Sequence, residues 1–237
     1  MASFHHRIKS GLKGAASEHA RYIGRRGKFS DRTDLVHEAV GNLPAWADNI
    51  LAFWKAADAH ERANGAAYRE HVIALPNELT REQNLDLALR LTEELVGNKT
   101  YQLAFHEPVG SVGGVANPHM HLMYSDRMND GIERTPQLTF SRYNSKNPNL
   151  GGCRKDSGGR SAESLRDQVI LTRKKIADIQ NQALAEHGCN VSVDHRSLRE
   201  QGKAKSPERH LGPARIKRMS DEQKRNLAVS RDSGPGR

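Results

Sequence analysis

Residues 101–125 read Tyr-Gln-Leu-Ala-Phe-His-Glu-Pro-Val-Gly-Ser-Val-Gly-Gly-Val-Ala-Asn-Pro-His-Met-His-Leu-Met-Tyr-Ser. Two strand-like runs, 101–107 and 119–125, flank a segment rich in glycine and valine. Because side chains alternate across a strand, Leu103 and Phe105 would share one face and His106 would lie on the other. The pattern predicts an antiparallel hairpin at the centre of the fold.

The chain around this hairpin mixes strand and helix patterns. Thr80-Arg-Glu-Gln83 has the form of a capping box, and Gly97 is a typical helix stop. Residues 142–162 are rich in Gly, Asn and Ser and predict a loop or lid. Further strands are expected at 4–10, 68–75 and 189–193, and helices at 15–26, 44–64, 80–96 and 163–187. This mixture predicts the α+β class: a central, mainly antiparallel sheet with helices packed on it.

Composition and charge exclude several classes of protein. The longest apolar run, Ile50 to Trp54, is far shorter than the roughly 20 residues that span a bilayer. The N-terminus lacks the apolar core of a secretory signal, and two cysteines cannot form a disulfide framework. We therefore expect a cytoplasmic protein without membrane insertion.

The positive charge is concentrated at the two ends of the chain. The net charge is +9; residues 7–28 hold seven basic residues and one acid, and residues 203–237 hold ten basic and four acidic residues. Such ends indicate a polyanionic partner such as nucleic acid, although solvated basic surfaces are the alternative. We expect a folded domain at 1–202 and a flexible basic tail at 203–237.

Three histidines form the sharpest chemical pattern. His119 and His121 would share one face of a strand with Cβ atoms about 7 Å apart, and His106 on the neighbouring strand has a compatible phase. Three imidazole ligands with open coordination positions are typical of a catalytic metal site. An isolated His-x-His pair also serves ordinary hydrogen bonding. The residues alone suggest a metallohydrolase or a metal-dependent phosphodiester enzyme.

Tyr22 lies within the expected basic helix at 15–26. A phenol becomes a useful nucleophile when cations, a metal-polarised phosphate or a carboxylate base lie nearby. The alternative is that Tyr22 packs with Ile23 against the sheet.

The order of Tyr22, then His106, then His119-Met120-His121 resembles the MobA/MobL (MobQ) conjugative relaxases of the HUH endonuclease superfamily, including those of IncQ mobilisable plasmids. The resemblance spans about residues 4–215. It is carried by Ala20–Lys28, Trp54–Asp58, Glu61–Gly65, Ala74–Pro76, Asn117–Met123, Arg127–Arg134, Asp194–Leu198 and His210–Pro213.

The resemblance implies a role for each matching residue. Tyr22 would be the nucleophile, and His106, His119 and His121 would hold a divalent metal, Mn²⁺ or Mg²⁺. Glu70 would orient a ligand or accept the tyrosine proton; relatives often carry a second acid where this chain has Val72. Asp126, which follows the histidine strand, would hydrogen-bond a ligand imidazole; the alternative is an ordinary surface aspartate of a hairpin.

The resemblance also implies the substrate and the partners. A relaxase nicks one DNA strand at the origin of transfer through a 5′-phosphotyrosyl intermediate and later religates it. Its DNA would be single-stranded or locally melted, and its partners would include other relaxosome proteins and the type IV secretion coupling protein. Candidate DNA contacts come from the basic helix and the 142–162 loop: Arg21, Arg25, Arg26, Lys28, Arg142, Lys146, Arg154 and Lys155.

Two other functions fit the same residues. A zinc hydrolase would use the three histidines and a metal-bound water without needing Tyr22. A non-enzymatic DNA-binding accessory protein would use the basic charge alone.

Overall fold

The computed structural model describes residues 4–110, 112–204 and 211–232. Five strands form one sheet in the order β1-β3-β5-β4-β2, and every neighbouring pair is antiparallel. The strands are β1 (His6–Leu12), β2 (Leu35–Gly41), β3 (Ala66–Ala74), β4 (Lys99–His106) and β5 (His119–Met128). The predicted α+β class and the central β4–β5 pair are confirmed.

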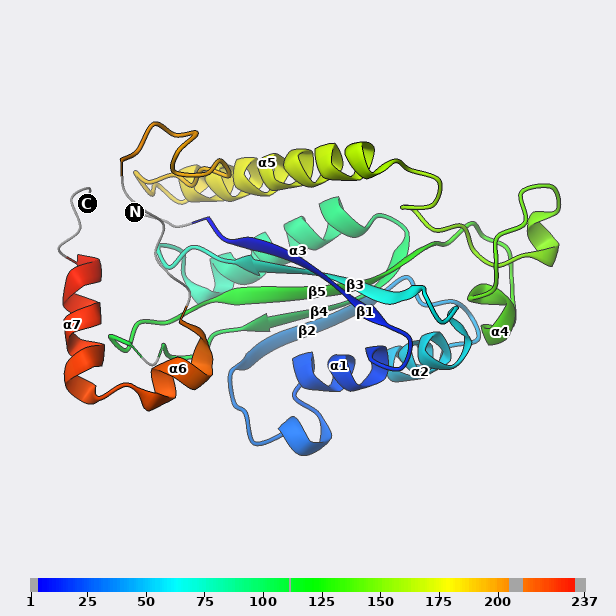
Figure 1. Cartoon of the computed structure of the whole chain (residues 1–237), viewed down its shortest axis with the longest axis horizontal. Coiled ribbons are helices and arrows are strands. Elements are labelled where there is room, and N and C mark those ends of the chain that lie inside the picture. The colour runs from blue at the N-terminus through cyan, green and yellow to red at the C-terminus, as the bar shows by residue number, and fades with distance from the viewer. Residues whose placement is uncertain (1–3, 111, 205–210, 233–237) are drawn as a thin grey trace.

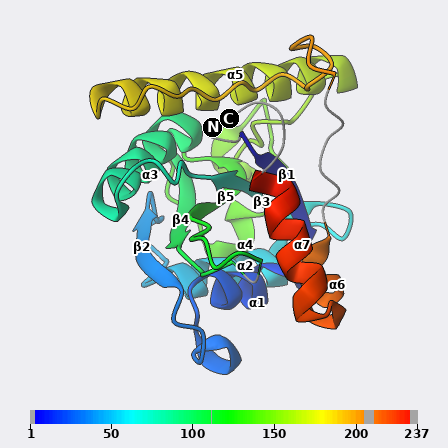
Figure 2. The same cartoon turned by 90° about the vertical axis from the view of Figure 1, so that its left-hand side faces the viewer.

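Helices cover both faces of the sheet (Figures 1 and 2). The short helix α1 (Ala16–Ile23) and helix α2 (Ile50–His60) lie on one face, and α3 (Arg81–Val96) and α5 (Ala162–Glu186) lie on the other. Two apolar cores result, because each strand sends alternate side chains to opposite faces. Leu103 and Phe105 belong to the core beneath α3 and α5, whereas Ala104 belongs to the core beneath α1 and α2.

Local signals fix the helix ends. At α3 the capping box of Thr80 and Gln83 is present, and Gly97 follows the helix with φ +57°. Helix α2 begins later than the sequence predicts, because the Asn49 side chain accepts a hydrogen bond from the Ala52 amide and caps the helix there. Residues 44–49 therefore precede the helix.

Two strand predictions need correction. Strand β2 has no counterpart among the predicted elements; it is an edge strand that pairs with β4. Residues 189–193 do not form the expected strand, because the Asn181 side chain on α5 pairs with the Val193 amide and carbonyl in place of a neighbouring strand. In addition, β1 continues through Gly11 to Leu12.

Two buried arginines hold the segment that follows β5, which contains α4 (Pro136–Thr139) and the 3₁₀ turn η2 (Pro148–Leu150). Arg127 donates to the carbonyls of Ser141 (2.9 Å) and Cys153 (2.8 Å). Arg134 donates to the carbonyl of Gly151 (2.8 Å). The predicted 142–162 loop is thus attached to the body by side chains that lie before it in the sequence.

The C-terminal segment contains two helices, α6 (Gly212–Arg218) and α7 (Asp221–Asp232), where the sequence predicts a flexible tail. Ala228 of α7 lies 3.7 Å from the position of a Cβ on Gly113, so α7 sits beside the loop that joins β4 and β5 (Figure 2). His210 of the family-like stretch lies outside the described residues, and the boundary at residue 202 stays a prediction. Within the described ranges, no helix has the length and apolarity needed to cross a membrane.

Two buried histidines on the α3/α5 side make the stability of the fold depend on pH. His6 Nε2 and His71 Nδ1 lie 2.8 Å apart, so one donates to the other. Burial lowers the pKa of His6 to about 3 and that of His71 to about 4, compared with about 6.5 in the unfolded chain. Because the unfolded chain binds more protons, the stabilisation is complete above about pH 6.5 and is lost as the pH falls toward 4.

When the pH falls from 7.5 to 5, we expect protonation of these two histidines in the unfolded chain to lower the free energy of unfolding by about 2–4 kcal/mol. Urea denaturation at both pH values should show a smaller loss for the His6→Leu/His71→Leu double variant than for the wild type. Replacing the exposed His60 by glutamine should leave the loss unchanged. An equal pH dependence in the double variant would contradict this account.

Candidate active site

Strand pairing brings the three predicted histidines together. In the β4–β5 ladder His106 pairs with His119, and His121 is the partner of Ala104 on the same face. The three ring centroids lie 5.1–5.5 Å apart. One nitrogen of each ring lies within 4.8 Å of the others.

Hydrogen bonds set the orientation of two of the rings. His119 Nδ1 donates to the Asn117 carbonyl (2.8 Å), and His121 Nδ1 donates to Glu70 Oε1 (2.8 Å). Burial lowers the pKa of His119. In both residues Nε2 is then the ring nitrogen left to bind a metal ion.

His106 uses both ring nitrogens within the protein. Its Nε2 donates to the Ile23 carbonyl (2.7 Å), and its Nδ1 accepts from Arg25 Nη2 (3.1 Å). Burial, together with the Arg25 cation, lowers the pKa of His106 to about 3, so the ring is neutral. Coordination of a metal by His106 would replace one of these two hydrogen bonds.

The spacing of the rings fits a divalent metal. With metal–nitrogen bonds of about 2.1 Å and ligand angles of 90–109°, imidazole centroids around one ion would lie about 4.6–5.4 Å apart. The observed separations, 5.1–5.5 Å, lie at or just above the upper end of this range. The three donors are all imidazoles, which suit transition metals.

Glu70 lies fully buried on β3 and joins α1 to the histidine cluster. Its Oε1 accepts from His121 and from His19 Nε2 (2.7 Å), and Lys9 Nζ lies 3.5 Å from its Oε2. Burial raises the pKa of Glu70, but the hydrogen bonds from His121 and His19 outweigh it and hold the pKa well below its usual range. An ionised Glu70 can orient His121; acceptance of the tyrosine proton stays a prediction.

Tyr22 faces the histidines from the last turn of α1. The Tyr22 and His121 rings are arranged edge to face, and their centroids lie 6.4 Å apart. The neighbouring residue Ile23 is fully buried in the core. The Arg25 and Arg32 guanidinium groups lie 4.9 and 5.3 Å from the ring centroid, and Arg32 Nη1 lies 3.4 Å from the hydroxyl. The Tyr22 ring thus lies beside two guanidinium groups and the histidine cluster.

Sequence reasoning missed three residues of this site. His19 precedes Tyr22 by three positions, so helical spacing could have placed both on one face. Asp34 binds Arg25 through both carboxylate oxygens (2.8 and 2.7 Å) and thereby holds it against His106. Arg32 lies in the connection between α1 and β2, where no periodic pattern marks it.

Three of the predicted site residues make contacts other than those expected. Asp126 lies five residues beyond His121 on β5, where it pairs with Arg69 (3.3 Å) and Ser157, so it does not support an imidazole. Lys155 binds Glu61 (3.2 Å) and the Ala66 carbonyl, and the buried Arg25 binds Asp34. The charges of Lys155 and Arg25 are therefore paired within the protein, and their contact with DNA stays a prediction.

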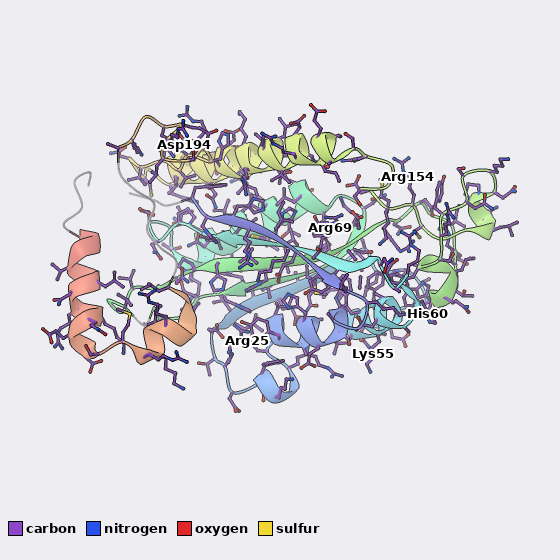
Figure 3. All side chains as sticks on the ribbon, viewed as in Figure 1. Arg25, Lys55, His60, Arg69, Arg154 and Asp194 are labelled. Carbon is purple, nitrogen blue, oxygen red and sulfur yellow. The ribbon has the colours of Figure 1, made fainter. Side chains whose placement is uncertain are left out.

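The other predicted DNA contacts fall into two groups. Near α1, Arg21 and Lys28 pair with Glu18, and Arg26 pairs with Glu38. On the segment after β5, Arg142, Lys146 and Arg154 are exposed, and Arg154 lies close enough to Asp156 to help lower the pKa of that carboxyl. Figure 3 shows Arg25 and Arg154 well separated along the long axis of the molecule, so the two groups lie apart.

Comparison with known proteins shows which family the sequence matches. A family model described as MobA/MobL family matches residues 12–222. The chain is 42% identical over 206 residues to the 43 kDa relaxation protein of Salmonella typhimurium, covering 85% of this chain and 56% of the relative. It is 40% identical over 221 residues to Mobilization protein A of Escherichia coli, covering 90% of this chain and 30% of that protein.

A solved structure supports the fold. The structure described as "Molecular Basis of Vancomycin Resistance Transfer in Staphylococcus aureus" matches with a TM-score of 0.57 and 21% identity, covering 83% of this chain and 100% of that chain. The chain spans about half the length of the Salmonella relative and under a third of the Escherichia one. With a family match over most of its length and two relatives at 40% identity or more, this chain belongs to the MobA/MobL family.

Proposed function

We propose that this chain is a plasmid mobilisation relaxase that nicks one DNA strand at the origin of transfer and later religates it. The observation that carries the proposal is the position of Tyr22, whose ring meets His121 of the three-histidine cluster. The names of the relatives, a relaxation protein and a mobilisation protein, point to the same activity.

The proposed reaction is a transesterification. The Tyr22 oxygen attacks the scissile phosphorus, and the bond from phosphorus to the 3′ oxygen breaks. The phenolic proton leaves to an acceptor or to solvent, and the leaving 3′ oxygen takes up a proton from that acceptor or from solvent. The products are a free 3′-hydroxyl and a 5′-phosphotyrosyl bond. Because that bond conserves the phosphodiester energy, the 3′-hydroxyl can reverse the step and close the strand.

Each nearby side chain has a task in this reaction. His106, His119 and His121 would hold a divalent metal, Mn²⁺ or Mg²⁺, which when bound supplies positive charge to the phosphate oxygens. Glu70 keeps the His121 ring in its orientation. Arg32, which reaches the Tyr22 hydroxyl and is exposed, is placed to bind the scissile phosphate and the developing phenolate.

The substrate in this proposal is single-stranded or locally melted DNA in the cytoplasm. The exposed Arg142, Lys146 and Arg154 would contact backbone phosphates, which position DNA without reading its sequence. Other relaxosome proteins and the type IV secretion coupling protein complete the proposed set of partners.

One incubation separates the proposal from its alternatives. The protein is mixed with Mn²⁺ and a single-stranded oligonucleotide that carries the cognate origin, and the products are separated in SDS. A relaxase leaves a covalent protein–DNA adduct, because the phosphotyrosyl bond survives denaturation. A zinc hydrolase would cleave without an adduct, and a DNA-binding accessory protein would only shift the band in a native gel. Either of these two results would overturn the proposal.

A further inference from the structure

We propose that Asp58, a residue of α2 that lies outside the histidine cluster, positions Tyr22 by capping the helix that carries it. The effect of Asp58 on cleavage rests on the proposed function. Its effect on the position of Tyr22 rests only on the contacts that hold α1, and it does not depend on the proposed function.

Helix α1 cannot hold its place by itself. It has eight residues, and isolated helices shorter than about 12 residues are marginal in water. The first amides of a helix need acceptors from outside it. The residue at the capping position is Ala15, which offers no side-chain acceptor.

Asp58 supplies the missing cap from another helix. Its Oδ1 accepts from the amides of Gly14 (2.9 Å) and Ala16 (2.8 Å), and its Oδ2 accepts from the amide of Ser17 (2.8 Å). A carboxylate at this end also interacts favourably with the helix dipole. Both oxygens of one half-buried side chain thus fix the start of α1.

The far end of α1 is fixed by the sheet. The fully buried Gln102 on β4 donates to the Ala20 carbonyl (3.1 Å) and to Glu38 Oε1 (2.7 Å), and His106 donates to the Ile23 carbonyl. With one end held by α2 and the other by β4, the axis of the helix and its rotation are determined. The direction of the axis and the rotation of the helix determine the position of the Tyr22 ring relative to His121.

The same end of α2 also holds the segment after β5. Glu61 binds Arg127 through both carboxylate oxygens (3.0 and 3.1 Å). A Cβ on Gly65 would lie 2.5 Å from Glu61 Oε1, which explains the glycine there. The family-like stretches Trp54–Asp58 and Glu61–Gly65 therefore form a scaffold that joins the Tyr22 helix to the exposed cations beyond β5.

The test compares Asp58→Ala and Asp58→Asn with two matched controls. Asp48→Asn changes an exposed aspartate just before α2, and Ile176→Val weakens the core on the opposite face of the sheet. The protein is labelled with 3-fluorotyrosine, and the ¹⁹F resonance of Tyr22 is assigned by its absence in Tyr22→Phe. Amide exchange at Ala16 and Ser17, oligonucleotide affinity and single-turnover cleavage are measured in parallel.

We expect Asp58→Ala to shift the Tyr22 resonance, to expose the Ala16 and Ser17 amides to exchange, and to slow cleavage about 10–100-fold. Affinity for the oligonucleotide should stay within about threefold, because the substitution removes no cation and the exposed Arg142, Lys146 and Arg154 lie on another segment. Asp58→Asn keeps an oxygen acceptor, so its resonance shift, amide exchange and cleavage rate should lie between those of the alanine variant and the wild type. If the alanine variant does not fold, the asparagine variant is used for the test. Both controls should keep the wild-type resonance and rate.

Two results would overturn the positioning role. One is a wild-type Tyr22 resonance with protected Ala16 and Ser17 amides in both Asp58 variants. The other is an equal loss of cleavage in Ile176→Val, which would make the effect one of general stability. A shifted resonance in a protein whose wild type cleaves no DNA would instead contradict the proposed function and leave the positioning role supported.

Discussion

Replacing Tyr22 by phenylalanine should abolish strand cleavage and the covalent adduct while leaving DNA affinity within about threefold. The substitution removes the one oxygen that attacks the phosphorus, and losing a nucleophile typically costs four or more orders of magnitude in rate. Binding rests on many phosphate contacts and loses none of them. The ring stays in place against His121, so the fold keeps its packing.

The matched control for this variant is Tyr143→Phe, an exposed tyrosine on the segment after β5. It should cleave at the wild-type rate. Quenched-flow cleavage and filter-binding measurements on the three proteins separate rate from affinity. An adduct that persists in Tyr22→Phe would move the nucleophile to another residue.

The second large effect should come from the metal ligands. We expect His119→Asn or His121→Asn to lower metal affinity at least about 100-fold and to lower cleavage with it. Asparagine retains a donor near the Nδ1 position, so the hydrogen bonds to Asn117 and Glu70 can survive while the Nε2 ligand is lost. Excess Mn²⁺ should restore part of the activity, and Mn²⁺ should bind more tightly than Mg²⁺ to imidazole ligands.

Titration calorimetry on the protein without DNA measures metal affinity separately from cleavage. The exposed His60→Asn variant on α2 should bind the metal as the wild type does. Cleavage that continues unchanged in excess EDTA, or unchanged metal affinity in both ligand variants, would contradict the role of the three histidines.

Short-range sequence patterns correctly predicted the ends of α3 and the face of the sheet on which the three histidines lie. The capping box at Thr80 and the glycine at 97 fixed α3 at both ends, because cap geometry depends on neighbours within four residues. The alternation of residues 101–107 and 119–125 placed His106, His119 and His121 on one face, because strand phase follows directly from sequence. The antiparallel pairing of those strands then brought the rings together.

Features that depend on contacts distant in sequence could not be predicted. Asp126 follows the histidine strand closely in sequence, but five residues along a strand take it about 17 Å away, where Arg69 binds it. In the sequence Lys155 cannot be distinguished from an unpaired loop cation, because its partner Glu61 lies 94 positions earlier. Strand β2 alternates weakly because it lies at an edge of the sheet. The role of Asp58 as the cap of α1 likewise needs the fold, because 42 residues separate it from Ala16.

The central claim is that Tyr22 attacks the scissile phosphate, and peptide mapping of the adduct tests it most directly. The protein is incubated with Mn²⁺ and the origin oligonucleotide, denatured and digested with trypsin and nuclease, and the nucleotide-bearing peptide is sequenced by mass spectrometry. The account predicts a single modified peptide, Tyr22-Ile-Gly-Arg25, with a 5′-phosphonucleotide on the tyrosine oxygen. A nucleotide on any other residue, or cleaved DNA with no modified peptide, would contradict it.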